Sequence, residues 1–171
     1  RYKLREEREG ASLFDNDLGQ TKRLSEQEYQ AILAGDCHNY TYLFDQNRQT
    51  PRFSLSLPHI PRKKLPQDCL SAPSKVYLEI TRKCNLHCMN CYNKSTSLSN
   101  RELSTERIFH LLKTISENGS FEVRITGGEA TTHPDFFKIV RYAKGLGLFV
   151  SLGSNGVWSK ALTTKIRALE L

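Results

Sequence analysis

The pattern of apolar and polar positions changes twice along the chain. Near the N-terminus, three short runs alternate apolar with polar residues as half-buried strands do, and turn residues separate them. These runs are YKLR at 2–5, ASLFD at 11–15 and TKRL at 21–24. We therefore expect residues 1–45 to form a small β-rich α+β module, whose modest core leans on another part of the molecule.

A helix is expected directly after these strands, in SEQEYQAILAG at 25–35. Ser25 suits the N-cap, Glu28 completes a capping box, and Gly35 suits the position just past the C-terminus. The helical spacing of the apolar residues predicts an inward stripe. Its members are Tyr29, Ile32 and Leu33.

The second part of the chain, residues 46–73, is expected to be a linker. It contains five of the six prolines of the chain. Because each proline fixes φ and removes a backbone donor, we expect neither a regular helix nor a central strand in this segment.

The third part, residues 74–171, repeats a strand, a polar loop and a helix three times. Pro134 suits the first position of the second helix, where its missing N–H is not needed. The alternation predicts an α/β fold with parallel strands, right-handed crossovers and ligand-binding loops at the carboxyl ends of the strands. Three such units do not complete a barrel, so we expect a fragment of a longer fold. The expected strands are 76–80, 121–126 and 148–152, and the helices are 104–119, 134–147 and 159–171.

Composition excludes several functions. The chain has no run of 18 apolar residues and no secretory signal, so we expect no membrane partner. Its net charge of +7 is scattered apart from PRKK at 61–64, which predicts a solvated basic surface and no nucleic-acid partner. Five cysteines, three of them bunched, favour a metal site in a reducing cytoplasm over a disulfide framework.

Candidate chemistry is concentrated in EITRKCNLHCMNCYNK at 79–94, where Cys84, Cys88 and Cys91 have the spacing Cys-x3-Cys-x2-Cys. Three thiolates on one loop can bind zinc or an iron–sulfur cluster. Structural zinc needs a fourth ligand, whereas a cluster held by three cysteines leaves one iron open for catalysis. The candidates for a fourth zinc ligand are His87, Cys69 and Cys37.

The segment CNLHCMNCY resembles the cluster-binding loop of the radical S-adenosylmethionine (SAM) enzymes, and it follows a strand as in that family. TGGEAT at 126–131 resembles the family's glycine–glycine–glutamate motif after the second strand, and SNG at 154–156 resembles the polar turn after the third. The resemblance implies that 74–171 is a partial (βα) radical SAM barrel, comprising the first three of six βα units.

The same resemblance implies the cofactors. Cys84, Cys88 and Cys91 would bind three irons of a 4Fe–4S cluster, and the fourth iron would take the amino and carboxylate groups of SAM. Further contacts to the cosubstrate would come from the other two motifs and from the residue before the last cysteine. These residues are Gly127, Gly128, Glu129, Ser154, Asn155 and Asn90.

Within this set, Gly127 and Gly128 are expected to present bare backbone where a ligand approaches closely. Glu129 is expected to bind the ammonium of SAM or to orient the loop that does. By family similarity, the reduced cluster cleaves SAM to a 5′-deoxyadenosyl radical that abstracts hydrogen from the substrate, and a flavodoxin or ferredoxin supplies the electron. The cofactors carry this chemistry, while the protein excludes water and aims the radical.

The N-terminal module, with its LFD strand and its Leu–Ser–x–x–Glu helix start, resembles the PqqD-like peptide-recognition module of radical enzymes that modify ribosomally made peptides. That resemblance implies a precursor peptide as partner, with its leader captured as an added β-strand. Four alternatives stay open at this point. They are a module that merely caps the barrel, a radical SAM enzyme of cofactor or tetrapyrrole biosynthesis, a zinc-binding module without redox chemistry, and an inactive truncated remnant.

Overall fold

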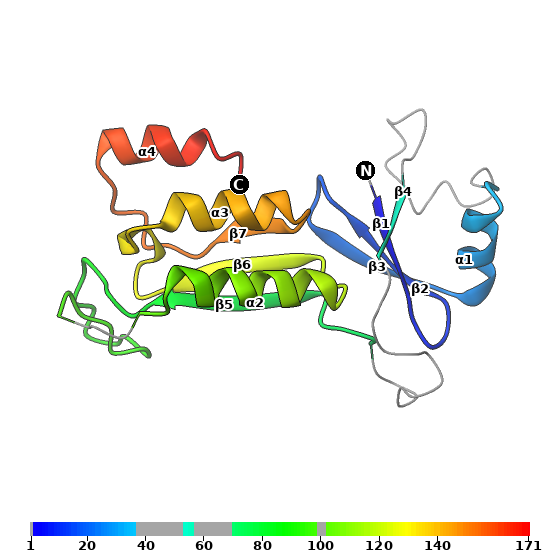
Figure 1. Ribbon diagram of the computed structural model, residues 1–171, viewed down its shortest axis with the longest axis horizontal. Coiled ribbons are helices and arrows are strands. Elements are labelled where there is room, and N and C mark those ends of the chain that lie inside the picture. Colours follow the sequence, from blue (N-terminus) through cyan, green and yellow to red (C-terminus); the bar gives the residue numbers. More distant parts are fainter. Residues whose placement is uncertain (1, 37–52, 57–69, 99–101) are drawn as a thin grey trace. The chain divides into compact units, whose positions relative to one another are not determined.

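The computed structural model describes residues 2–36, 53–56, 70–98 and 102–171, and they form two compact units (Figure 1). The first unit comprises Arg1–Ser74 and Glu117–Phe121, and the second comprises Lys75–Ser116 and Glu122–Leu171. The short piece Glu117–Phe121, which leads from one helix to the next strand of the second unit, therefore belongs to the first.

The first unit is built on a four-stranded sheet in the order β3-β2-β1-β4. The three N-terminal strands are antiparallel neighbours, and β4 pairs in parallel with β1. β4 lies within segment 46–73, where we expected a linker with neither a regular helix nor a central strand. In the described sheet β4 is an edge strand, a position where proline-rich surroundings are tolerated. The strands are β1 (Tyr2–Glu6), β2 (Ala11–Asp15), β3 (Gln20–Leu24) and β4 (Phe53–Ser56).

Helix α1 (Glu26–Leu33) has the expected ends. Ser25 and Glu28 form a capping box, and Gly35 adopts a φ of +81°, which glycine reaches without a steric penalty. Tyr29 and Ile32 are buried, but Leu33 is 49% exposed, so its expected place in the core is wrong. The helix has eight residues and buries a narrow stripe. The core of this unit consists of Tyr2, Leu4, Ala11, Leu13, Leu24, Tyr29 and Ile32.

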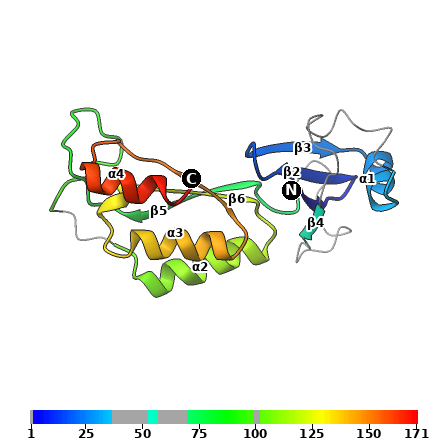
Figure 2. The same cartoon turned by 90° about the horizontal axis from the view of Figure 1, so that it is seen from above.

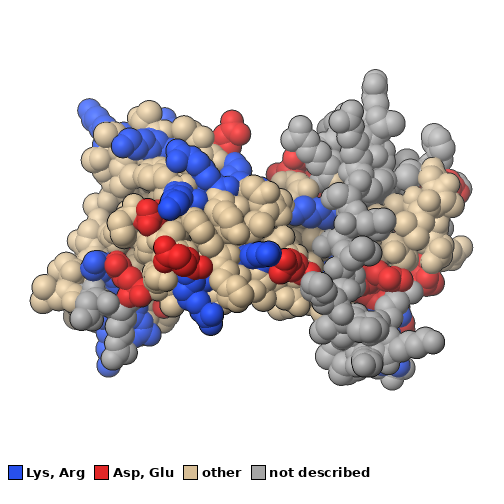
Figure 3. Space-filling view, in the orientation of Figure 1, with Lys and Arg blue, Asp and Glu red and all other residues tan. Residues whose placement is uncertain are grey.

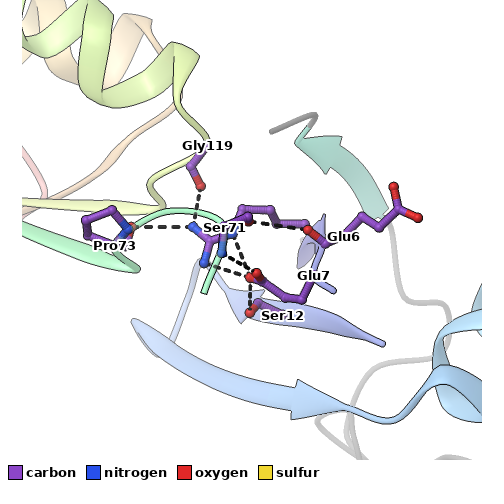
Figure 4. Close-up of polar contacts among 7 residues, drawn as sticks. Glu6, Glu7, Ser12, Ser71, Pro73 and Gly119 are labelled. Carbon is purple, nitrogen blue, oxygen red and sulfur yellow. Dashed lines mark hydrogen bonds and ion pairs between the residues drawn. The ribbon is translucent and has the colours of Figure 1, made fainter. Parts of the chain in front are cut away.

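A buried ion pair also lies in the first unit (Figure 4). Arg5 on β1 donates from Nε to Oε1 of Glu7 at 2.8 Å and from Nη1 to the carbonyl of Gly119 at 2.8 Å. The second Glu7 oxygen accepts from the backbone N–H of Ser71 at 2.6 Å, and both charged side chains are fully buried. The pair thereby joins β1 to segment 70–74 and to the piece 117–121.

The second unit contains a three-stranded parallel sheet in the order β5-β6-β7, which confirms the expected α/β architecture. Helices α2 and α3 lie on the same side of this sheet (Figures 1 and 2). The elements are β5 (Lys75–Thr81), α2 (Thr105–Glu117), β6 (Glu122–Gly127), the 3-10 turn η3 (Ala130–Thr132), α3 (Phe136–Gly145), β7 (Phe149–Leu152) and α4 (Lys160–Arg167).

Helix α3 starts two residues later than expected. Pro134 lies in the preceding turn, and Asp135 occupies the N-cap position. The ring of His133 accepts at Nδ1 from the backbone N–H of Asp135, at 3.1 Å, and its Nε2 lies 3.3 Å from the carbonyl of Leu103. His133 therefore has the structural role at the helix entrance that its place before a proline suggests.

Alternation along the strands gives the sheet two different faces. The face toward the helices is apolar and forms a single core with them. The opposite face is polar: Glu122 accepts from Ser151 Oγ at 2.7 Å and pairs with Lys75 at 2.7 Å, and the guanidinium of Arg124 lies over the ring of Tyr77. The buried core members are Leu78, Ile80, Ile108, Leu112, Val123, Ile125, Ala130, Phe136, Ile139, Val140, Ala143, Leu148, Val150, Ile166 and Leu169.

Charge on the second unit is distributed unevenly. On the face seen in Figure 3, basic side chains predominate over α3 and α4, while acidic and basic side chains mix over α2. Within the described part of the chain, no helix has the length and apolar character needed to cross a membrane.

Candidate functional site

Three loops meet at the carboxyl end of the parallel sheet. The cysteine loop follows β5, the Gly127–Glu129 segment ends β6, and the polar turn 153–157 follows β7. In parallel α/β folds this edge is where ligands bind, because the connecting loops gather there. The structure thus brings together the three motifs that the sequence analysis singled out.

Gly127 and Gly128 allow close packing between the first two loops. The N–H of Gly128 donates to the Thr81 carbonyl at 2.9 Å. A Cβ on Gly127 would lie 2.4 Å from the Thr81 oxygen, and one on Gly128 would lie 2.4 Å from the Lys83 oxygen. These backbone atoms therefore occupy the space that a side chain at either position would need, and the contact of the two glycines with a ligand stays a prediction. The glycines hold the cysteine loop against the end of β6.

Glu129 joins the ends of β6 and β7. Its carboxylate is fully buried, and Oε2 accepts from Ser154 Oγ at 2.7 Å and from the Asn155 backbone N–H at 2.8 Å. The other oxygen accepts from the hydroxyl and the N–H of Thr131, at 2.7 and 3.2 Å. Its own N–H donates to the Lys83 carbonyl at 2.8 Å, which adds the cysteine loop.

These contacts decide the charge of Glu129 and its role. Burial opposes ionisation, but the hydrogen bonds from Thr131, Asn155 and Ser154 outweigh it and lower the pKa of the carboxyl. Both oxygens are already bonded to protein donors, so in this structure Glu129 holds the loops together. Its contact with the ammonium group of SAM stays a prediction.

Cys84 is the buried member of the three cysteines. Its sulfur accepts from the backbone N–H of Leu86 at 3.4 Å and from Nδ2 of Asn155 at 3.8 Å. The same Asn155 nitrogen donates to Oδ1 of Asn85 at 2.8 Å. The polar turn after β7 is thus bonded directly to the first cysteine of the loop and to its neighbour.

Cys88 is exposed and Cys91 is partly exposed. A backbone hydrogen bond from Cys91 to the Cys88 carbonyl, at 3.2 Å, places both in one turn. Backbone N–H groups of Ser95, Asn93 and Lys94 point at the Cys91 sulfur and lower its pKa, because they stabilise the thiolate. Lys94 has a φ of 48°, and such left-handed residues help successive N–H groups converge on an anion.

The residues of this loop fit a metal cluster in chemistry, although the sulfur atoms are not gathered around one point. Among the described residues, no group of three or more Cys, His, Asp or Glu side chains is arranged to hold a metal ion. Nevertheless, three thiols on one loop, with N–H groups directed at two of the sulfurs, form the donor set of an iron–sulfur cluster. The hydroxyl of Ser95 is buried beside Gly128 without a hydrogen-bond partner in the described structure, so a polar donor is available there.

The remaining candidate residues are either exposed on the cysteine loop or outside the described part of the chain. Asn90 is exposed on the cysteine loop, and His87 is also exposed, as expected of a solvated side chain. Cys37 and Cys69, the other candidates for a fourth zinc ligand, lie outside the described residues. Sequence reasoning missed Asn85 and Thr131. Their side chains have no periodic signal, but each is a short polar residue beside a motif, which is the cue that could have found them.

Comparison with known proteins defines the family. Residues 78–170 match the model of the radical SAM superfamily. Since this match covers more than half of the chain, the chain belongs to the radical SAM superfamily.

Individual relatives are similar over the same part of the chain. It is 36% identical over 100 residues to the AdoMet-dependent heme synthase of Methanosarcina barkeri, covering 57% of this chain and 29% of that protein. It is 36% identical over 88 residues to the mycofactocin maturase MftC of Mycolicibacterium smegmatis, covering 52% and 22%. It is 35% identical over 100 residues to the PqqA peptide cyclase of Bradyrhizobium diazoefficiens, covering 58% and 25%. The chain thus spans less than a third of the length of these relatives.

Solved structures are similar over nearly the whole chain. SuiB of Streptococcus suis, solved bound to S-adenosylmethionine, has a TM-score of 0.66 and 19% identity, over 96% of this chain and 43% of SuiB. The same protein bound to the precursor peptide SuiA has a TM-score of 0.65 and 18% identity, over 95% and 43%. At this level of identity the likeness establishes a shared fold, which includes a partial radical SAM barrel and the β-rich piece before it.

Proposed function

We propose that the protein is a radical SAM enzyme that binds a 4Fe–4S cluster through Cys84, Cys88 and Cys91 and acts on a precursor peptide. The observation that carries this proposal is the hydrogen-bonded junction of three loops at the carboxyl end of the sheet, in which Glu129 and Asn155 are fixed against the cysteine loop. When bound, the cluster and SAM supply the one-electron cleavage that starts hydrogen abstraction.

The chain's own residues have separate tasks in this proposal. Glu129 stays ionised and fixes the ends of β6 and β7, and Gly127 and Gly128 hold the cysteine loop against them. We place the cosubstrate beside these glycines, where Ser154, and Asn90 on the exposed cysteine loop, offer polar groups to it. An external reductant such as flavodoxin or ferredoxin supplies the electron. The need for such a reductant, together with the three free thiols, fits a reducing cytoplasm.

Three observations favour a peptide as the substrate. The relatives include MftC, a maturase, and the PqqA peptide cyclase, and the likeness to SuiB, which was solved with a precursor peptide, extends over the N-terminal unit. Within the described residues, β3 pairs only with β2, and its side chains from Gln20 to Arg23 are exposed. We propose that a leader peptide adds to this edge as a further strand. The similarity to a heme synthase keeps a small tetrapyrrole as the second candidate.

Anaerobic reconstitution with iron and sulfide tests the cluster. We expect about four irons per chain, since a 4Fe–4S cluster holds that number, together with cleavage of SAM under a strong reductant. Cys88→Ala is the best loss variant because the Cys88 side chain is exposed, so its removal leaves the apo fold intact. Met89→Ala, at a residue that is 98% exposed on the same loop, is the matched control. A wild-type protein that takes up zinc and no iron–sulfur cluster would falsify the proposal.

Binding measurements test the substrate class. A fluorescent peptide taken from a short open reading frame beside the gene is titrated against the wild type and against Lys22→Glu/Arg23→Glu. We expect weaker binding by the double variant if the peptide lies along β3 and carries acidic residues. Binding that is unchanged would remove the β3 edge from the proposal, and specific binding of a tetrapyrrole instead of the peptide would favour the second candidate.

A further inference from the structure

The contact between Asn155 and the Cys84 sulfur has a consequence beyond loop packing. It is a hydrogen bond from a side chain on the turn after β7 to a sulfur that we assign to the cluster, at an N···S distance of 3.8 Å. Hydrogen bonds to ligating sulfurs are among the features that set the reduction potential of an iron–sulfur cluster. The orientation of the Asn155 carboxamide therefore matters.

Backbone partners fix that orientation. The N–H of Val157 donates to Oδ1 of Asn155 at 2.9 Å. Because a backbone N–H cannot accept a hydrogen bond, its partner must be the carbonyl oxygen of the side chain. The amide nitrogen of Asn155 is thereby turned toward Cys84 and Asn85.

Asn85 reinforces the same arrangement from the cysteine loop. Its Nδ2 donates to the Val157 carbonyl at 3.1 Å, which can only accept, so its Oδ1 faces Asn155 and accepts from Nδ2 at 2.8 Å. The two asparagines and the Val157 backbone form a closed set of hydrogen bonds, which we call the asparagine clamp. Each of these hydrogen bonds would be lost if the side-chain amide of Asn85 or Asn155 were flipped.

The base of the clamp is anchored as well. The Asn155 backbone N–H donates to the buried carboxylate of Glu129 at 2.8 Å. Glu129 in turn donates from its own N–H to the cysteine loop at Lys83. The Asn155 side chain is thus held both through its backbone N–H and through its carboxamide. Its position does not depend on the free thiol of Cys84, whose S–H group faces Asn85 Oδ1 at 4.0 Å.

We propose that Asn155 is a positioning residue that raises the reduction potential of the cluster by donating its side-chain N–H to the Cys84 sulfur. Reduction adds negative charge to the cluster, and an N–H dipole directed at a ligating sulfur stabilises that charge. Asn85 has a different role, because it orients Asn155 and makes no hydrogen bond of its own to the sulfur once Cys84 is a thiolate. The inference rests on the proposed function, since it requires a cluster on Cys84.

A redox titration of the reconstituted full chain, followed by electron paramagnetic resonance without SAM, tests the proposal. We expect a more negative midpoint potential in Asn155→Ala, and a larger shift in Asn155→Asp, which keeps the acceptor for Val157 but directs a carboxylate oxygen at the sulfur. Met89→Ala, at an exposed residue of the cysteine loop outside the asparagine clamp, is the control and is expected to stay close to the wild type. An unshifted potential in Asn155→Ala, or an equal shift in Met89→Ala, overturns the proposal. A wild-type protein that binds no cluster overturns the proposed function and this inference together.

A second measurement needs no variant of Asn155. Wild-type protein labelled with ¹⁵N at the asparagine side-chain amides is reduced and examined by pulsed paramagnetic resonance. We expect a weak coupling between the cluster and one ¹⁵N nucleus, and the coupling is expected to persist in Asn85→Ala. A cluster-loaded wild type without this coupling contradicts the hydrogen bond even where the Asn155 variants fail to bind the cluster.

Discussion

At the scale of single residues, Glu129 combines a charge with complete burial. A carboxylate that loses its water must be compensated by donors, and here two come from Thr131, one from Ser154 and one from the Asn155 backbone. These donors belong to different loops. The hydrogen bonds that keep Glu129 ionised therefore also hold the loops together.

Replacement of Glu129 by glutamine tests this link through pH. At neutral pH we expect Glu129→Gln to lower the free energy of unfolding by about 2 kcal/mol, because a neutral amide leaves at least one buried donor unpaired. The folded-state pKa of Glu129 is lowered, so its stabilising contribution is present above the ordinary glutamate range and is lost as the pH falls through the folded pKa. Urea denaturation at several pH values should show the gap to wild type narrowing on acidification, whereas a pH-independent gap would contradict this. The exposed Glu106→Gln is the control.

Gly128 provides a steric test at the same scale. A Cβ at this position would lie 2.4 Å from the Lys83 oxygen and 2.8 Å from the Arg82 oxygen, and backbone atoms cannot rotate away as a side chain does. We expect Gly128→Ala to reduce stability by about 3 kcal/mol and to displace the cysteine loop.

The matched control for Gly128 is Gly145, the last residue of α3, where an added Cβ meets nothing within 4 Å. Gly145→Ala should raise stability by up to about 1 kcal/mol, since alanine favours the helix. Urea midpoints compare the two variants. Equal effects would show that the space around Gly128 is not restrictive.

The sequence identified the site residues as motifs but not their contacts. The spacing of the cysteines and the positions of Gly128 and Asn155 after strands are visible in the chain, because strand ends are marked by a change in periodicity. The packing of Gly128 on the Lys83 carbonyl and the pairing of Asn155 with Asn85 join residues far apart in the sequence. Contacts between irregular loops leave no periodic pattern in the sequence from which they could be predicted.

At the scale of elements, the β1 strand depends on the buried pair of Arg5 and Glu7. Burial opposes the charge on Glu7, but hydrogen bonds from Ser12 and Ser71, together with Arg5, lower its pKa. The guanidinium also lies 4.7 Å from the centre of the Phe121 ring. One arginine thereby connects β1 to chain segments that follow it by more than 60 residues.

Removing one partner of this pair should lower the free energy of unfolding by more than the intact pair contributes to it. We expect Arg5→Met to lower the free energy of unfolding by about 3 kcal/mol, because Glu7 would remain as an uncompensated buried charge. The double variant Arg5→Met/Glu7→Gln should recover part of this loss, since neither charge then remains. Urea denaturation of both single variants and the double variant gives the coupling. Arg23→Met on the exposed β3 is the control, and a double variant as unstable as the sum of the singles would contradict the argument.

Element boundaries show where sequence reasoning is weakest. FSLS at 53–56 alternates apolar and polar residues as a strand does, but the prolines around it favour an irregular segment. The pairing of β4 with β1 is a contact that only the folded chain shows. At Pro134, the hydrogen bond from Asp135 to the His133 ring holds a turn and delays the helix, which residue preferences alone do not reveal.

At the scale of the whole molecule, each unit has its own core and its own task in the proposed function. The first unit presents the β3 edge for a peptide, and the second gathers the three loops that would hold the cofactors. The piece 117–121 could not be assigned to the first unit from sequence, because the last residue of α2 and the four residues before β6 look like an ordinary connection. Its place follows from contacts such as the stacking of Phe14 on Phe121, whose ring centres are 5.1 Å apart.

Cofactor loading should therefore act unevenly on the two units. A ligand stabilises the structure that binds it by mass action, so we expect reconstitution to slow amide hydrogen exchange in the cysteine loop, in 127–131 and in 153–157. The exchange rates in β1, β2 and β3 should change by no more than a factor of about two, because these strands belong to the first unit. A change of that size corresponds to well under 1 kcal/mol. Mass spectrometry of anaerobically loaded and apo protein measures both, with Cys88→Ala taken through the same treatment to remove effects of iron and sulfide alone. Equal protection of the first unit would mean that the two units unfold as one, and no protection of the three loops would mean that the cluster is bound elsewhere.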